Sequence, residues 1–390
     1  MKKSSLFLGL CLIAGSLEAG THQENLAILR SIPLIKGFER KNSDEDAIAR
    51  KLHGIFSKIA DESKNADGSI NRGTHAKGAC YDGEVTVFSA DELKKNFKYS
   101  PALISRIKKG FFKHDGVYQT EVRFANAKGQ RNPDTANDVR AMAFAIETNN
   151  VMKDMSGGSR FDFMMNSSPM FAVNNIKQFY ELMKGARLFM GDISYVLNPF
   201  YIKSTLKAKK LLEEYERNDI KSYATEEYWS NLPFTHGLKN GKPEEVVKYK
   251  VTPCNLKGRV SEASTGKADD YLQKDILGRV QNDKVCFYLQ VQLFDYKKLK
   301  TSLNGVNKKW SQIDWIENGG ELWDESVLPY YTVAKIETPA HLNKIMSSCK
   351  YRYINTRLHA LEEHIPMGSI ARVRTYVEEK SRAKRMGEIK

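Results

Sequence analysis

The chain has 390 residues, 41% of them hydrophobic, and carries a formal net charge of +14 at pH 7. That length can hold one large domain or two modest ones, and the hydrophobic content is ordinary for a soluble globular protein. Basic runs such as Lys207–Lys210 and Lys380–Arg385 can attract nucleic acid or an anionic membrane, but no aromatic residues are interleaved with them. They are therefore interpreted as solvated helical faces, and no nucleic-acid partner is expected.

Residues 1–19 have the pattern of a secretory signal peptide. Lys2 and Lys3 form a basic start, and the short apolar stretch 5–14 follows. This stretch is shorter than the roughly 20 residues that span a bilayer, and no later segment is apolar enough to be a transmembrane helix. Cleavage after Ala19 would release the mature protein into the periplasm or the medium.

The cysteines give no framework for the fold. Export permits disulfides, but four cysteines in a mature chain of this length are too few for a disulfide scaffold, and their spacing does not give the pairing. No C-x-x-C pair or His-rich cluster indicates a zinc site. The four are Cys80, Cys254, Cys286 and Cys349.

Residues 20–64 are predicted to form an N-terminal helical arm, because apolar residues recur at helical spacing within 48–56. From residue 72 to about 173, short strand-like runs are separated by Gly, Asn, Asp and Pro, which indicates a β-barrel core. The predicted strands in this part are 85–88, 117–124, 139–146 and 161–165.

The second half of the chain adds helices and one clear strand. Residues 174–228 have helical patterning, 258–270 are polar and predicted to be an exposed loop, and 369–385 lack Gly and Pro and are predicted to form a helix. Within residues 284–294, apolar residues alternate on one face at Val285, Phe287, Leu289, Val291 and Leu293, which is the clearest strand pattern of the chain. The predicted class is therefore α+β.

Five motifs follow one another in an order that is difficult to attribute to chance. They are Arg72-x-x-His75-Ala-Lys-Gly, Val-Arg123-Phe, Asp134-Thr-Ala-x-Asp138-Val-Arg140, Asp162-Phe-Met-Met-Asn166-x-x-Pro169-x-Phe171 and Glu363-His364-x-Pro366-x-Gly368-Ser369-Ile370. In order and spacing they resemble the catalase-like superfamily, and its small catalase-related peroxidases more than full-length catalases. The resemblance covers most of residues 65–385.

This resemblance implies a catalase-like antiparallel β-barrel with flanking helices and a C-terminal proximal helix, together forming one haem domain over 65–390. The implied cofactor is haem b (iron protoporphyrin IX). His75 would transfer a proton between the two peroxide oxygens, a task for which a neutral imidazole with a pKa near 6.5 is suited. Small residues around His75 leave room for a large flat ligand. Asn166 would hydrogen-bond the peroxide, although capping the turn before Pro169 is its alternative role.

The resemblance also assigns the residues that bind the porphyrin. Arg72 and Arg123 match positions near the haem propionates, where a guanidinium pairs with a carboxylate; structural ion pairs are the alternative. Phe171 and Phe124 would pack on the porphyrin, although a buried strand aromatic is more often plain core. Arg372 would support the iron ligand described next.

Catalase-type iron is held by a Tyr phenolate one helical turn after an Arg. Arg372-Val-Arg-Thr-Tyr376 has this spacing and makes Tyr376 the predicted metal ligand. An ungapped register from Gly368 instead puts Glu378 at the ligand position, one turn after Arg374. Positions 376 and 378 point about 200° apart on a helix, so they cannot both face the same haem. If Glu378 occupies the position, haem could be held weakly or not at all.

The expected function is that of an exported haem peroxidase that reduces hydrogen peroxide or organic hydroperoxides with an unknown electron donor. Ala125 stands where catalases commonly carry a serine that bonds the distal histidine, which favours slow peroxidase turnover over rapid disproportionation. Two alternatives remain open: hydroperoxide rearrangement, which needs no co-substrate, and a catalase-fold protein that only binds haem or has lost it. No membrane span is expected, and a homo-oligomer is compatible with the resemblance.

Overall fold

The structure of the protein is a computed structural model that describes residues 21–62, 64, 68–188, 202–254, 268–282, 285–302, 309–338, 345–346 and 353–389. The predicted signal peptide lies outside the described residues, as do Cys349 and most of the predicted loop 258–270.

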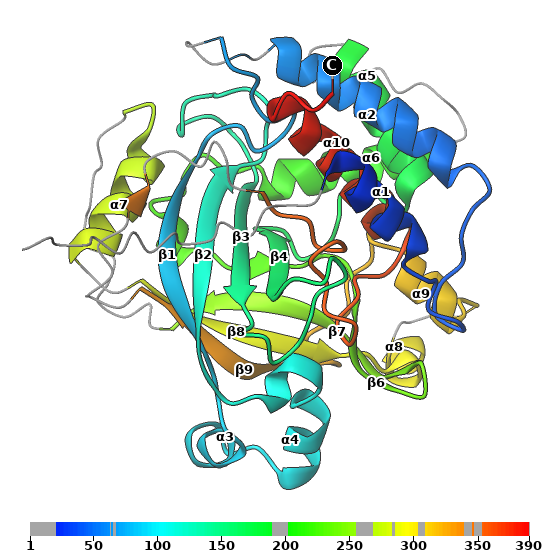
Figure 1. Ribbon diagram of the computed structural model, residues 1–390, viewed down its shortest axis with the longest axis vertical. Coiled ribbons are helices and arrows are strands. Elements are labelled where there is room, and N and C mark those ends of the chain that lie inside the picture. The colour runs from blue at the N-terminus through cyan, green and yellow to red at the C-terminus, as the bar shows by residue number, and fades with distance from the viewer. Residues whose placement is uncertain are drawn as a thin grey trace, which may run out of the picture.

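An antiparallel β-barrel forms the centre of the molecule (Figure 1). Its first four strands are those predicted between residues 72 and 173, and they pair in sequence order. The order then continues through β5, β7, β8 and β9, and β1 pairs with β9 as well as with β2, which closes the ring of eight strands. The bounds are β1 (Gly78–Val87), β2 (Gly116–Asn126), β3 (Arg140–Glu147), β4 (Arg160–Asn166), β5 (Tyr228–Trp229), β7 (Lys242–Pro253), β8 (Cys286–Leu293) and β9 (Tyr330–Glu337). Two short strands, β6 (Phe234–Lys239) and β10 (Ile345–Met346), pair with β7 and β1.

Strand alternation fills the barrel with apolar side chains, because every second residue of a strand points to the same face. In β8 the residues Phe287, Leu289 and Val291 are fully buried, as their alternation predicts. Aromatic rings add most of the volume, and Phe144 stacks on Phe163 with ring centroids 4.5 Å apart. The core of the barrel is therefore packed with side chains.

Five helices gather beside the barrel, at the upper right of Figure 1. The C-terminal helix α10 packs against α1, α2 and α5, and α6 contacts α5. The pattern of α2 explains this packing, since Ile48 and Leu52 lie one turn apart and are buried in the same cluster as Val373 and Val377 of α10. The bounds are α1 (His22–Ser31), α2 (Glu45–Glu62), α5 (Ile176–Leu188), α6 (Ile202–Tyr215) and α10 (Ser369–Arg385).

The remaining helices lie around the barrel. In Figure 1, α3 and α4 lie at the bottom, α7 at the left, and α8 and α9 at the lower right. Their bounds are α3 (Ala90–Phe97), α4 (Pro101–Ile107), α7 (Tyr271–Asn282), α8 (Tyr296–Ser302) and α9 (Gln312–Glu317), with short 3-10 turns at Gly110–Lys113 and Tyr223–Thr225. Within the described parts of the chain, no helix has the length and apolar character needed to cross a membrane.

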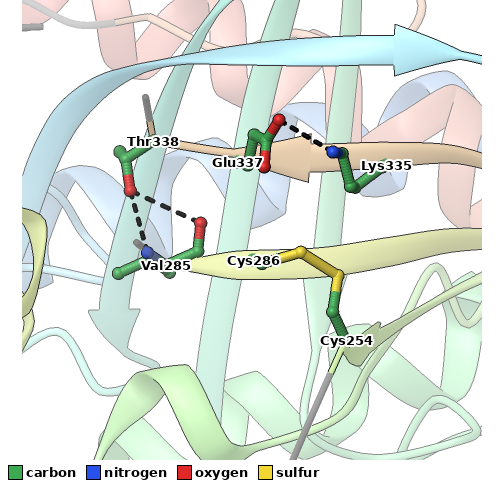
Figure 2. The surroundings of a disulfide bond; sticks show 6 residues. All are labelled: Cys254, Val285, Cys286, Lys335, Glu337 and Thr338. Carbon is green, nitrogen blue, oxygen red and sulfur yellow. Dashed lines mark hydrogen bonds and ion pairs between the residues drawn. A yellow bond between two sulfur atoms is a disulfide. The ribbon is translucent and has the colours of Figure 1, made fainter. Parts of the chain in front are cut away.

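A disulfide between Cys254 and Cys286 ties the end of β7 to the start of β8 (Figure 2). Beside it, Thr338 Oγ1 accepts a hydrogen bond from the Val285 N–H at 3.0 Å, and Lys335 pairs with Glu337 at 2.8 Å. Cys80 is disulfide-bonded as well. Sequence spacing did not give these pairings.

Candidate functional site

His75 lies just before β1 in a backbone conformation that few residues adopt. Its φ is +57°, in the left-handed region. For a residue other than glycine this conformation costs about 1–2 kcal/mol of conformational free energy. Two hydrogen bonds fix this conformation: its N–H donates to Ala127 O at 3.0 Å, and its carbonyl accepts from Arg123 Nη2 at 2.5 Å. The fold therefore holds the His75 ring in one direction.

The surroundings of His75 keep its imidazole neutral. Burial, assisted by the charges of Arg123, Arg72 and Arg374, lowers the pKa of His75 to about 3, although a hydrogen bond with Asn166 opposes the shift. The residue still retains some accessible surface, and its Nε2 is buried without a hydrogen-bond partner. A neutral ring with an unused nitrogen is chemically a proton acceptor.

Asn166 ends β4 and is held from its other side by Asn231. The Asn166 amide Nδ2 donates to Asn231 Oδ1 at 2.9 Å, and Asn231 Nδ2 donates to Ser168 O at 2.5 Å. Asn231 is itself buried and has φ +58°, a conformation that asparagine tolerates better than most residues. This pair explains how an Asn166 side chain at a strand end keeps a fixed orientation beside His75.

Arginines gather around His75, and their charges reach one another. Burial lowers the pKa of Arg123 to about 10, with Arg385 and Arg131 adding to the shift and Tyr223 opposing it. Burial likewise lowers the pKa of Arg385 to about 10, and holds the pKa of Arg72 well below its usual range, together with the charges of Arg123 and Arg385. Arg123 Nε is buried without a hydrogen-bond partner. Such a cluster favours a bound anion, because a carboxylate would relieve the repulsion.

One face of α10 completes the site. Arg374, Glu378 and Arg385 are four and seven residues apart, so they project within about 40° of one another. The charge of Arg374 acts on His75, and that of Arg385 acts on Arg72 and Arg123. This face of α10 is therefore directed toward the site.

Glu378 brings a carboxylate into these surroundings. Its Oε1 lies 3.3 Å from Arg374 Nε, while its Oε2 is buried without a hydrogen-bond partner. Burial raises the pKa of Glu378 to about 7, with Arg374 opposing the shift. Within the described residues, no cluster of three or more His, Cys, Asp and Glu side chains suited to a metal ion occurs.

Tyr376, the predicted iron ligand, lies on the opposite side of α10. Its ring packs in the cluster that α10 forms with α2 and α5, beside Val373 and Val377, and Lys380 Nζ lies 5.9 Å from the ring centroid. The structure does not bring Tyr376 together with His75. The reason is helical phase, because the face that carries Arg374 is turned about 200° away from position 376.

Arg372, predicted to support the cofactor, lies in a cluster of ion pairs. Its guanidinium lies 2.6 Å from Glu39, 2.8 Å from Glu45 and 3.1 Å from Glu317. Two of these carboxylates belong to the N-terminal arm, so Arg372 fastens the arm to α10. It is two residues too early in the helix to share the face of Arg374.

The two aromatic residues considered for packing on the porphyrin, Phe124 and Phe171, lie in different surroundings. Phe124 is fully buried inside the barrel and stacks on Tyr223 at 5.3 Å, which confirms the plain core role. Phe171 is half-buried, and its ring lies 5.3 Å from Phe179 of α5. It packs where α5 meets the start of α10, and its contact with a porphyrin stays a prediction.

Small residues near His75 serve close backbone packing. A Cβ at Gly73 would lie 2.7 Å from Phe56 O of α2, and one at Gly78 would lie 2.3 Å from Phe124 O and 2.9 Å from Arg123 Nη2. Gly78 faces Ala125 in the β1–β2 register. The glycines thus let the arm, the loop and β2 approach one another and admit the Arg123 guanidinium, in addition to any room they leave for a ligand.

The third motif is a buried scaffold for this loop. Asp134 pairs with Lys77 Nζ at 2.7 Å and accepts from Asn126 Nδ2 and the Leu272 N–H, both at 2.8 Å. Arg140 donates to the carbonyls of Asp134 and Arg217. His364 is structural as predicted: its Nε2 accepts from the Phe111 N–H at 2.9 Å, and its Nδ1 lies 3.1 Å from the Tyr249 hydroxyl.

Sequence reasoning missed two residues of the site. Arg385 lies in the basic run 380–385, which was interpreted as a solvated face, yet Arg382 in this run is buried against Glu379 and Arg385 acts on Arg72. The spacing of seven residues between Glu378 and Arg385 was the signal available, because residues seven apart lie on the same face of a helix. Asn231 gave no local signal, because only the pairing of β4 with β5 brings it beside Asn166.

The fold is that of catalases. A fungal catalase superposes with a TM-score of 0.61 at 16% identity, covering 82% of this chain and 60% of that one. Catalase A from Saccharomyces cerevisiae gives 0.61 at 16%, covering 91% and 68%, and a bacterial catalase gives 0.55 at 17%, covering 90% and 63%. The chain thus has the catalase-like antiparallel barrel with flanking helices that its motifs predicted.

In sequence, the chain is similar to the allene oxide synthase-lipoxygenase protein of Plexaura homomalla. The two are 22% identical over 291 residues, which cover 69% of this chain and 24% of that protein. The chain therefore spans about a quarter of the length of this relative. No family model matches the chain.

Proposed function

We propose that the protein is a haem-dependent enzyme that acts on hydroperoxides. The observation that carries this proposal is the neutral His75 ring, whose buried Nε2 has no hydrogen-bond partner and which lies near Asn166 and a group of arginines. The catalase-like fold and the similarity to a protein named for allene oxide synthesis support it.

The side chains of the site fit a haem. Arg123 and Arg385, with pKa values lowered by burial, suit the two carboxylates of protoporphyrin IX. His75 and Asn166 form the polar side of the site, and Glu378 presents a free carboxylate oxygen from α10. Bound haem would supply the iron chemistry of the reaction.

The chain's own residues would handle the proton. His75 Nε2 accepts it from the hydroperoxide and returns it to the other oxygen, which a ring that stays neutral at physiological pH can do. Asn166, fixed by Asn231, orients the hydroperoxide through its amide. The hydrogen bonds of the His75 backbone fix the point from which its side chain enters the site.

We propose reduction of hydrogen peroxide or organic hydroperoxides by an electron donor as the main reaction. Ala125 offers no hydroxyl to the site, so rapid disproportionation is not expected. Rearrangement of a hydroperoxide without a donor is the second candidate, and the allene oxide synthase-lipoxygenase relative favours it. Products distinguish the three reactions: oxygen release, donor oxidation, or an isomerised product with neither.

The test is haem reconstitution followed by peroxide assays of the wild type and His75→Gln. The variant should lose about 10²- to 10⁴-fold in turnover, the usual contribution of a positioned acid-base group. His114→Gln, at an exposed histidine, is the matched control and should keep full turnover. Full turnover in His75→Gln, with haem bound, would leave a haem-binding protein as the better description.

We also propose that the enzyme works outside the cytoplasm. The signal-like segment 1–19 and the disulfide bonding of Cys80, Cys254 and Cys286 support this, since disulfides persist in oxidising compartments. N-terminal sequencing of protein from the periplasm or medium should start near Gly20. Recovery of an uncleaved chain in the cytoplasm would contradict the proposal.

A further inference from the structure

We propose that the Glu378 carboxylate, positioned by Arg374, would hold the iron of a bound haem in this protein, in place of a tyrosine phenolate. This inference rests on the proposed haem binding and assigns the one position at which the chain departs from the tyrosine ligation that its motifs predict.

The first argument is the direction in which Glu378 projects from α10. Arg374, Glu378 and Arg385 share one face of α10, and the charges of both arginines act on the residues around His75. Glu378 lies between them along this face. Tyr376 is excluded by the same geometry, because its ring is packed among α2 and α5 side chains.

The second argument is that one oxygen of the Glu378 carboxylate has no hydrogen-bond partner. Arg374 Nε lies 3.3 Å from Glu378 Oε1, within ion-pair distance, and a hydrogen bond from its Nη2 to Thr356 Oγ1 at 3.3 Å holds the guanidinium beside the carboxylate. Glu378 Oε2 has no hydrogen-bond partner although it is buried. Buried carboxylate oxygens normally have a hydrogen-bond partner, so the unpartnered Oε2, on a carboxylate paired with Arg374, is available to a metal.

The neighbouring Glu379 shows what a structural glutamate looks like in this helix. Its Oε1 lies 3.1 Å from His22 Nδ1 and 2.8 Å from Arg382 Nη2, and its Oε2 accepts from the Tyr353 hydroxyl at 2.6 Å. Both oxygens of Glu379 are thus used in fastening α1 and the segment before α10. Glu378 has no comparable set of partners, which separates a binding role from a packing role.

Tyr353 is not an alternative ligand. Its hydroxyl is engaged by Glu379 and by Asn355 Nδ2 at 2.9 Å, and burial raises the pKa of Tyr353 well above its usual value, so the phenol stays protonated. A phenolate for the iron is therefore not offered by Tyr353 or Tyr376.

The test is titration of haem b into the full mature chain and four variants, read by absorption and electron paramagnetic resonance rather than by turnover. Wild type should bind one haem in a ferric high-spin form. Glu378→Ala should lose at least about tenfold in haem affinity, and Arg374→Met about 10- to 100-fold, the range found when a group that orients a metal ligand is removed.

The remaining two variants separate the positions. Glu378→Tyr should bind haem with the charge-transfer bands of a phenolate ligand, whereas Tyr376→Phe should keep the wild-type affinity and spectrum. Circular dichroism of each variant checks that it is folded. An unchanged spectrum and affinity in folded Glu378→Ala, or loss of haem in folded Tyr376→Phe, would overturn the assignment while haem binding itself stands.

Absence of haem from the wild type has two readings that the same set of proteins distinguishes. If Glu378→Tyr then binds haem, position 378 faces the haem but Glu378 itself does not hold the iron, and the ligand assignment is overturned. If no variant binds haem, the proposed function fails and the assignment fails with it.

Discussion

Buried charges in this protein are of two kinds, and the difference is visible at single residues. Lys77 and Asp134 are both almost fully buried and lie 2.7 Å apart, so each neutralises the other. Arg123 donates to a backbone carbonyl and has an unpartnered Nε, and burial lowers its pKa. The Lys77–Asp134 ion pair is therefore structural, whereas the unpartnered Nε of Arg123 leaves this guanidinium able to bind an anionic ligand.

Replacing each cation by methionine should expose this difference. Lys77→Met leaves Asp134 buried and unpaired, so the free energy of unfolding should fall by about 3–5 kcal/mol. Arg123→Met removes a buried charge together with one hydrogen bond and should lower it by about 1 kcal/mol at most. Denaturant unfolding of the haem-free proteins measures both values. Equal destabilisation by the two changes would contradict the assignment of Arg123 to ligand binding.

Sequence could identify the residues of the polar side of the site but not their partners. His75, Asn166, Arg72 and Arg123 stand in motifs whose order is readable, and the structure brings His75 together with the other three. Whether Arg372 or Arg374 faces the site depends on the rotational phase of α10. A shift of two residues in the alignment turns the expected face to the opposite side of the helix. Only the contacts of Arg372 with Glu39, Glu45 and Glu317 decide it.

At the scale of elements, α10 joins the arm to the barrel through its two faces. One face carries Arg374, Glu378 and Arg385 toward His75, and the other packs on α1, α2 and α5. Arg372 lies where the arm meets the start of the helix. Attachment of the arm and direction of the site face are therefore linked, since turning α10 to move one would move the other.

Arg372→Met should release the arm. It leaves Glu39 and Glu45, both nearly fully buried, without their cation, so the free energy of unfolding should fall by about 3–5 kcal/mol. Limited proteolysis should then cut between α1 and α2 faster than in the wild type. Arg106→Met is the matched control, because the Arg106 side chain is 48% exposed and its pair with Glu245 should contribute about 1 kcal/mol or less. Equal effects of the two variants would argue against the anchoring role.

Most elements of the first half were predictable, but three of the eight barrel strands, β5, β7 and β9, were not predicted. The strands predicted within 72–173, the helix in the arm and the helix over 369–385 are confirmed, whereas helical patterning over 174–228 ends at Tyr215. β7 was not predicted, and Lys248 and Lys250 interrupt the apolar residues of this segment. In the structure Lys248 Nζ lies 4.8 Å from the Trp323 ring centroid, and Lys250 pairs with Glu227 and Glu325, so tertiary contacts bury both.

At the scale of the whole molecule, closure of the barrel leaves the site on a rigid support. β1 pairs with β2 and β9, and the Cys254–Cys286 disulfide joins the end of β7 to the start of β8, the strand that pairs with β9. His75 lies three residues before the start of β1 and Asn166 ends β4, so both are held close to strands of one closed sheet. The helical layer, by contrast, supplies Glu378 and Arg385 from α10.

Acid stability of the whole molecule should depend on buried neutral histidines. Burial lowers the pKa of His75 to about 3 and that of His236 to about 4, and it holds the pKa of His364 well below its usual value. Below pH 6.5 the unfolded chain therefore binds protons that the folded chain does not, so the free energy of unfolding decreases as pH falls from about 6.5 toward 4. Each such histidine adds up to about 1.4 kcal/mol per pH unit to this slope.

His236→Gln tests whether a buried neutral histidine causes the loss of stability at acid pH. His236 Nε2 lies 2.8 Å from Ile107 O while its Nδ1 is buried without a partner, so a proton on Nδ1 would create a buried donor with no acceptor. Glutamine can keep the bond to Ile107 and cannot gain the proton, so the slope between pH 4.5 and 6 should flatten by about one proton in His236→Gln. Urea unfolding of the haem-free protein across this range measures the slope, with His114→Gln as the exposed control. A slope unchanged by His236→Gln, or flattened equally by His114→Gln, would show that the buried ring does not cause the acid instability.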